Sequence, residues 1–114
     1  MNRFFENNNF FIISIGAIIA AFLRWQIDQI FIVNTLGCFL LGFVNALSFS
    51  KKYKLFLGFA FCGSLTTFSG WSFQLFSLIK QSFYGIFFLN IIITMILGII
   101  ACGLGHFLAK KIIN

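Results

Sequence analysis

Charge is scarce in this sequence. Only 9% of its 114 residues are charged, whereas 61% are hydrophobic and the mean hydropathy is +1.03. Soluble globular domains carry about 25% charged residues. The shortage of charge therefore excludes a soluble domain and predicts an integral membrane protein.

Four apolar segments are separated by short charged loops. A spanning helix needs about 20 mostly apolar residues, and the candidate spans are residues 8–23, 29–50, 55–79 and 82–109. The loops leave no room for a soluble domain, so we expect one four-span domain over residues 1–114. No convincing small-residue cleavage site follows the first segment, so we expect it to be retained as a span.

The basic residues lie mostly at the ends of the predicted spans. No basic stretch is long enough to follow a phosphate backbone, so we expect contact with lipid headgroups and not with nucleic acid. Arg24 and Lys80 lie on one side of a four-span protein. The other side carries Arg3, Lys51, Lys52, Lys54, Lys110 and Lys111. Because basic residues favour the cytoplasm, both termini are predicted there.

A polar run interrupts the third predicted span. Gly63 and Ser64 adjoin, and Thr66, Thr67 and Ser69 follow them. Small and hydroxyl residues also let helices pack closely, so a packing role remains open. Adjacent small residues nevertheless weaken a helix, and the hydroxyls can bond backbone groups that a break would free. A helix broken in mid-membrane exposes carbonyls that can hold a cation.

Two aromatic residues follow the polar run. Phe68 and Trp71 are three residues apart and so share a helix face. In a chain with 19 phenylalanines, contact with the core or with lipid is the plain alternative. Aromatic ring edges are electropositive, however, and edges that face a pore can stabilise a small anion without trapping it.

Other polar residues of the predicted spans also allow two interpretations, a packing or anchoring role and a role in binding an anion. Asn34 and Asn45 lie near one face of the second span, and Asn90 and Thr94 share a face of the fourth. They can join helices through hydrogen bonds, or an asparagine amide can donate to an anion that has lost its water. Arg24 either anchors the first span at the headgroups or draws an anion toward a pore mouth.

Three of these stretches resemble motifs of the fluoride channel family (Fluc, also called CrcB). GAIIAAFLRW is similar to the family's glycine-rich run ending in arginine, IVNTLGCFLLG to its asparagine and glycine signature, and FCGSLTTFSGW to its FCGGxTTFSTF motif. The resemblance covers nearly the whole chain. It implies a four-span helical protein, not an enzyme, that forms antiparallel dimers in the bacterial plasma or inner membrane and exports fluoride passively.

The resemblance also implies roles for single residues. Gly63 and Thr66 are expected to lend backbone carbonyls to a structural sodium ion, not transported, on the dimer axis, and Arg24 is expected near the vestibule. The expected fluoride pathway comprises Asn34, Thr67, Phe68, Ser69, Trp71, Asn90 and Thr94.

Trp71 departs from the family motif, because it stands where the second phenylalanine of the aromatic pair is expected. Tryptophan keeps a ring edge and adds an N–H donor, but it is larger. Conduction through this subunit's own pore and a non-conducting role as a partner subunit therefore both remain open.

The charge bias bears on the dimer. Six basic residues on one side of the membrane against two on the other predict a single orientation. An antiparallel dimer then needs a paralogue of opposite charge bias, so we expect a heterodimer. A homodimer is the alternative. A small multidrug-resistance-type exporter is a further alternative by size. Such an exporter needs a carboxylate inside the membrane, whereas Glu6 and Asp28, the two acids of the chain, lie outside the predicted spans.

Overall fold

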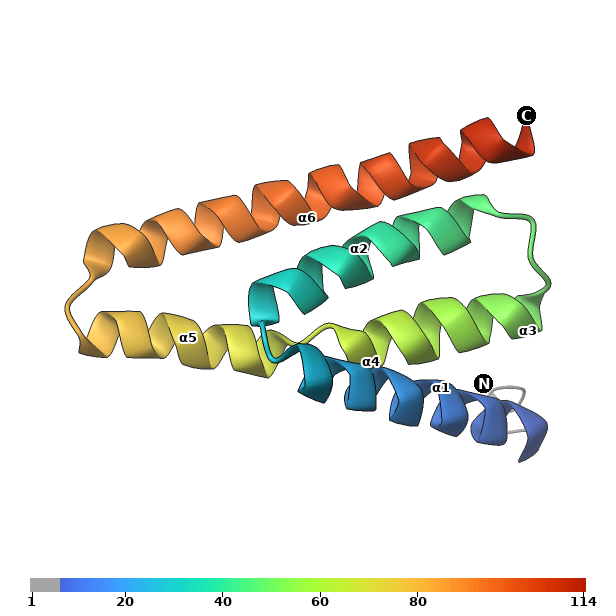
Figure 1. The fold of residues 1–114 in the computed structure, drawn as a ribbon, viewed down its shortest axis with the longest axis horizontal. Helices are drawn as coiled ribbons and strands as arrows, with labels where there is room; N and C mark the ends of the chain where they lie inside the picture. Colours follow the sequence, from blue (N-terminus) through green and yellow to red (C-terminus); the bar gives the residue numbers. More distant parts are fainter. Residues whose placement is uncertain (1–6) are drawn as a thin grey trace.

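The computed structural model describes residues 7–114, and this part of the chain is helical without strands (Figure 1). The all-helical prediction is confirmed for these residues, whereas Arg3 and Glu6 lie outside them. The helices are α1 (Asn7–Ile27), α2 (Ile30–Ala46), α3 (Lys51–Lys54), η1 (Leu55–Cys62), α4 (Gly63–Leu65), α5 (Phe68–Lys80) and α6 (Tyr84–Ile113), of which η1 has π-helical hydrogen bonding.

Two sets of packing contacts determine how the helices are arranged. The long helix α6 packs along α2, while α1 packs against η1 and α4. One continuous helical segment comprises α3, η1 and α4. A non-helical break at Thr66 and Thr67 separates it from α5 (Figure 1). The start of α1, α3 and the end of α6 lie at one end of the molecule, and the turn between α5 and α6 lies at the other.

The helices differ in length. Within the described residues, Asn9–Ile27 and Tyr84–Ile113 are long and apolar enough to cross a membrane, and Ile30–Ala46 is a shorter apolar helix. The third predicted span is divided by the break into shorter pieces. Length and composition thus support two spanning helices directly, and the four-span arrangement stays a prediction.

The apolar side chains mostly face outward. A small core contains Ala20, Val33 and Leu65, whereas Ile99 is 75% exposed on α6. Single-chain soluble proteins rarely expose large continuous apolar surfaces. The outer surface therefore suits lipid or a partner subunit.

Glycines allow α2 and α6 to approach closely. A Cβ atom at Gly42 would overlap the Cys102 carbonyl, and a Cβ atom at Gly105 would overlap the Phe39 carbonyl. Close approach through small residues is a common mode of helix packing in membranes. These two glycines therefore fix the distance between α2 and α6.

The interruption of the third segment lies three residues after the predicted weak point. Gly63 is helical, with φ −64° and ψ −34°, whereas Thr66 and Thr67 are extended, with ψ of 151° and 116°. The helix continues past Gly63 because the Thr66 N–H still donates to the Cys62 carbonyl at 3.1 Å. Adjacent small residues alone do not end it.

Candidate functional site

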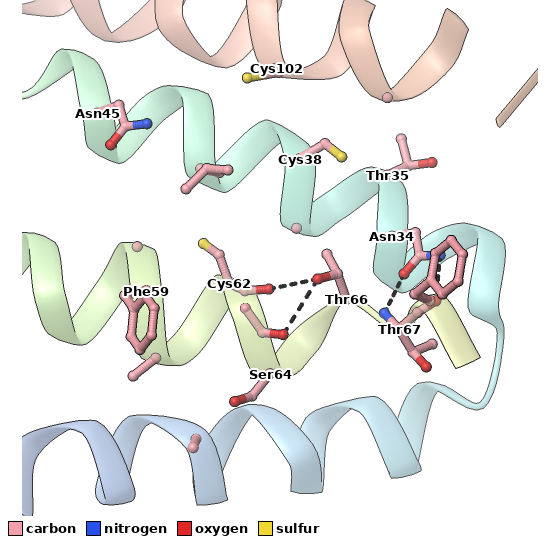
Figure 2. A pocket seen from close by; sticks show the side chains of 18 of the residues that line it. Asn34, Thr35, Cys38, Asn45, Phe59, Cys62, Ser64, Thr66, Thr67 and Cys102 are labelled. Carbon is pink, nitrogen blue, oxygen red and sulfur yellow. Dashed lines mark hydrogen bonds between the residues drawn. The ribbon is translucent and has the colours of Figure 1, made fainter. Parts of the chain in front are cut away.

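The side-chain amide of Asn34 hydrogen-bonds the Thr67 backbone at the break through both its oxygen and its nitrogen. The Thr67 N–H donates to Asn34 Oδ1 at 2.7 Å, and Asn34 Nδ2 donates to the Thr67 carbonyl at 3.1 Å. Figure 2 shows the Asn34 side chain on α2 turned toward Thr67. Helix ends leave backbone groups without intrahelical partners, and this side chain supplies partners from a different helix.

The two threonines bond the local backbone with their hydroxyl groups. Thr66 Oγ1 donates to the Cys62 carbonyl at 3.1 Å (Figure 2). Thr67 Oγ1 accepts from the Gly70 N–H at 3.1 Å, which makes Thr67 the N-cap of α5. It also lies 3.3 Å from Ser69 Oγ. Hydroxyl bonding of the backbone at the break is what the sequence predicted for these threonines.

Two carbonyls beside the break lose the donors that a continuous helix would provide. In an α-helix the carbonyl of residue i accepts from the N–H of residue i+4. The donor for Gly63 would be the Thr67 N–H, which is bonded to Asn34. The donor for Thr66 would be the Gly70 N–H, which is bonded to the Thr67 hydroxyl. Both carbonyl oxygens thus lack their helical backbone donors and can accept a ligand from outside the helix.

The space beside Gly63 is also open. A Cβ atom at this glycine would meet nothing within 4 Å, and its carbonyl receives a long contact of 3.5 Å from Thr66 Oγ1. Carbonyl oxygens are ligands that alkali cations accept in membrane proteins. The residues present therefore fit the expected sodium ion.

Arg24 lies beside the break. Its Nη1 donates to the Ser64 carbonyl at 3.1 Å, at the carboxyl end of α4. Arg24 also lines a cavity of about 340 Å³ together with Asp28, Thr67 and Ser69. The guanidinium group thus connects α1 to the third segment, close to the predicted pathway residues.

A larger groove of about 1280 Å³ runs along α2, between α6 and the helical segment formed by η1 and α4 (Figure 2). It brings together most of the residues that the sequence predicted for the site: Asn34, Gly63, Thr66, Thr67, Phe68, Trp71 and Thr94. Arg24 and Ser69 line the smaller cavity instead, and Thr67 lines both. Asn90 lines neither of the two.

The aromatic pair lies at this groove. The ring centroids of Phe68 and Trp71 are 5.6 Å apart with an interplanar angle of 58°, and Phe68 is 76% exposed. Trp71 Nε1 donates to Asn90 Oδ1 at 2.9 Å, and Thr94 Oγ1 donates to the same oxygen at 3.3 Å. The bond between Trp71 and Asn90 joins α5 to α6, whereas the bond between Thr94 and Asn90 lies within α6.

Three thiols also line the groove, although the sequence did not single them out as site residues. Cys38, Cys62 and Cys102 are free cysteines on α2, η1 and α6 (Figure 2). Small side chains within the spans were the only available signal, and close helix packing produces the same signal. Over residues 7–114, no group of histidine, cysteine and acidic side chains could hold a metal ion.

Comparison with known proteins agrees with the motifs. The family model described as CrcB-like protein, Camphor Resistance (CrcB), matches residues 11–106. Fluoride-specific ion channel FluC 1 of Prochlorococcus marinus (strain NATL2A) is 50% identical over 107 residues, which cover 94% of each chain. Fluoride-specific ion channel FluC of Pyrococcus abyssi (strain GE5 / Orsay) is 35% identical over 85 residues, 70% of this chain and 69% of its own.

A further relative extends the comparison. Fluoride-specific ion channel FluC 2 of Synechococcus sp. (strain CC9902) is 37% identical over 106 residues, 89% of this chain and 79% of its own. The resemblance found in the three sequence motifs is therefore confirmed, and the chain belongs to the CrcB family, together with these fluoride-specific ion channels.

Proposed function

We propose that the chain is a fluoride channel that lets fluoride leave the cell passively and so relieves fluoride toxicity. The observation that carries the proposal is that the polar break and the aromatic pair open onto one groove. Membership in a family with members named fluoride-specific ion channels supports the choice of ion. A channel, and not an enzyme, is the function that these features favour.

The groove suits a small anion because it offers weak donors. The edges of Phe68 and Trp71 carry partial positive charge, and no acidic side chain lines the groove in the described residues. Lys51 and Lys54 line it near α3, where their charge attracts anions. A channel must bind its ion strongly enough for entry and weakly enough for release.

The positions of the acids support passive transport. Proton-coupled exporters of the small multidrug-resistance type use a carboxylate within the membrane. Asp28, the acid within residues 7–114, is exposed in the turn between α1 and α2. The exporter alternative is therefore not favoured.

We further propose that the Gly63 and Thr66 carbonyls hold a structural sodium ion. Asn34 and the Thr67 hydroxyl keep backbone donors away from these carbonyls, because they take the two N–H groups that would otherwise pair with them. The bound ion would supply a fixed positive charge at the break. Gly63 contributes by leaving open the space that a side chain would fill.

The proposed assembly is an antiparallel dimer closed over the groove. The lysines of α3 and of the last turn of α6 lie at the same end of the molecule (Figure 1). This asymmetry supports a single orientation and hence a heterodimer with an oppositely oriented paralogue. Relatives with the numbered names FluC 1 and FluC 2 are compatible with such a pair. A homodimer, or a pair in which this subunit does not conduct, is the alternative.

Labelling tests the orientation. The substitution Asn114→Cys places a thiol in the C-terminal tail, and a membrane-impermeant maleimide is applied to intact cells and to inside-out vesicles, with the parent chain as control. We expect labelling in the vesicles alone. Equal labelling from both sides would show dual insertion and support the homodimer.

Growth tests the function in cells. A bacterial strain that lacks its own fluoride exporter should grow at elevated fluoride when it expresses this chain, alone or with its paralogue. The Phe68→Ile variant should support less growth than the parent chain. If neither combination restored growth although the chain was present in the membrane, the channel proposal would be wrong.

A further inference from the structure

We propose that Asn90 is a positioning residue that holds the indole N–H of Trp71 away from the fluoride pathway, so that the anion meets the edge of the ring. This inference rests on the proposed fluoride channel function. Trp71 lines the groove, whereas its hydrogen-bond partner Asn90 does not. The indole N–H therefore points to a residue that does not line the groove.

The Asn90 amide is itself held in one orientation. Its Oδ1 accepts from Trp71 Nε1 at 2.9 Å and from Thr94 Oγ1 at 3.3 Å. Both partners act here as donors, and an indole nitrogen can act in no other way. A flipped amide would turn its own N–H groups toward the indole N–H and lose the bond to Trp71. Thr94 lies four residues after Asn90, on the same face of α6.

The bond has a consequence for an anion in the groove. An indole N–H is a stronger donor than a ring C–H edge, and a fixed strong donor would retain the anion. Without Asn90, a half-buried indole N–H would lack a partner, which is costly, and the ring would turn toward water or toward the anion. Asn90 thus allows a tryptophan to present a ring edge, as a phenylalanine does.

Substitutions separate positioning from direct contact. Asn90→Leu removes the acceptor with little change in volume. Fluoride efflux is measured from liposomes, with the paralogue included if flux requires it. We expect efflux to fall about three- to tenfold, which is the factor for the loss of one hydrogen bond. Trp71→Phe removes the N–H that needs a partner, and its efflux rate is the reference for the double variant. The double variant should match Trp71→Phe alone.

Phe76→Leu is the matched control for the loss of a large side chain. Phe76 is 61% exposed on the same helix as Trp71 and lines neither cavity, so efflux should not change. If Asn90→Leu lowered efflux by the same factor in the Trp71→Phe background, Asn90 would act on the ion directly and the inference would be wrong.

A second readout does not depend on conduction. The chain has two tryptophans, and Trp71→Phe assigns the Trp71 indole N–H signal in a nuclear magnetic resonance spectrum of the protein in micelles. We expect Asn90→Leu to shift this signal and to make it respond to sodium fluoride, whereas the parent signal does not respond. An unchanged signal in Asn90→Leu would contradict the proposed bond.

The two readouts also distinguish the inference from the function on which it rests. In one outcome the protein passes no fluoride, alone or with its paralogue, while Asn90→Leu still shifts the indole signal. The channel function and the role of Asn90 in fluoride passage would then both be wrong, and the bond between Trp71 and Asn90 would be a packing contact. If the parent passed fluoride but the double variant showed additive losses, the inference alone would be wrong.

Discussion

The backbone N–H of Thr67 lies 2.7 Å from Oδ1 of Asn34, although 33 residues separate them in the chain. This bond takes the donor that the Gly63 carbonyl would use in a continuous helix. One side chain on α2 therefore decides where the third segment stops being helical. The proposed sodium site and one wall of the groove both depend on it.

The Asn34→Leu substitution should destabilise the break. It leaves the part-buried Thr67 N–H and carbonyl without their partners, and an unsatisfied group costs up to about 3 kcal/mol. The free energy of unfolding in detergent should therefore fall. The Asn45→Leu variant is the control, because Asn45 lies on the same helix and is exposed, and surface substitutions stay within about 0.5 kcal/mol. Equal effects of the two variants would contradict the assigned role of Asn34.

The Gly63→Val substitution should impair assembly more than the fold of the subunit. Apart from its own helix backbone and chain neighbours, a Cβ atom at Gly63 meets nothing within 4 Å, so the subunit can accept the side chain. The valine would occupy the space beside the two open carbonyls and exclude sodium. Dimer content, measured by size-exclusion chromatography in sodium and in N-methylglucamine buffer, should lose its dependence on sodium.

Thr66→Ser is the matched variant for the sodium site. It keeps the backbone carbonyl and the hydroxyl that donates to the Cys62 carbonyl. Dimer content should therefore remain dependent on sodium. A Gly63→Val protein with the sodium dependence of the parent would show that the proposed ion site is misplaced.

Gly105→Ala and Gly103→Ala should change stability in opposite directions. A Cβ atom at Gly105 would overlap the Phe39 carbonyl, whereas a Cβ atom at Gly103 would meet nothing within 4 Å. Overpacking costs about 1–3 kcal/mol, and replacing a helical glycine by alanine gains up to about 1 kcal/mol. Thermal unfolding in detergent should show a lower midpoint for Gly105→Ala than for Gly103→Ala. The reverse order would exclude close contact between α2 and α6 at this point.

The Phe68→Ile substitution should reduce fluoride flux with little loss of stability. Isoleucine retains bulk but lacks the electropositive ring edge, and Phe68 is 76% exposed in the subunit. Flux should fall by up to about tenfold, the upper range for an aromatic contact. Phe73→Ile is the control, because Phe73 is 70% exposed on α5 and lines neither cavity. Equal flux in both variants would assign Phe68 a packing role.

Local sequence identified the break but not its position. The adjoining Gly63 and Ser64 predicted a weak point, yet a helix continues until its donors are taken by other groups. The group that takes the Thr67 donor belongs to Asn34 on a different helix. Such a contact depends on how α2 packs, which the polar run does not encode by itself.

The same limit applies to the pathway residues. Phe68 and Ser69 are neighbours in the motif, but successive helix residues point about 100° apart, and these two line different cavities. Trp71 and Asn90 were both predicted for the pathway from separate spans. Their mutual hydrogen bond follows from the packing of α5 against α6. Residue type was therefore predictable from the motifs, whereas partners and facing directions required the fold.

The most direct measurement compares fluoride and chloride efflux from liposomes at equal pH on both sides. Vesicles that contain the purified protein, with its paralogue where needed, are loaded with potassium fluoride or chloride, and valinomycin balances the charge. A passive fluoride channel predicts rapid fluoride efflux, little chloride efflux and no effect of a protonophore on the fluoride rate. Equal fluoride and chloride rates, or fluoride efflux that requires a proton gradient, would contradict the account.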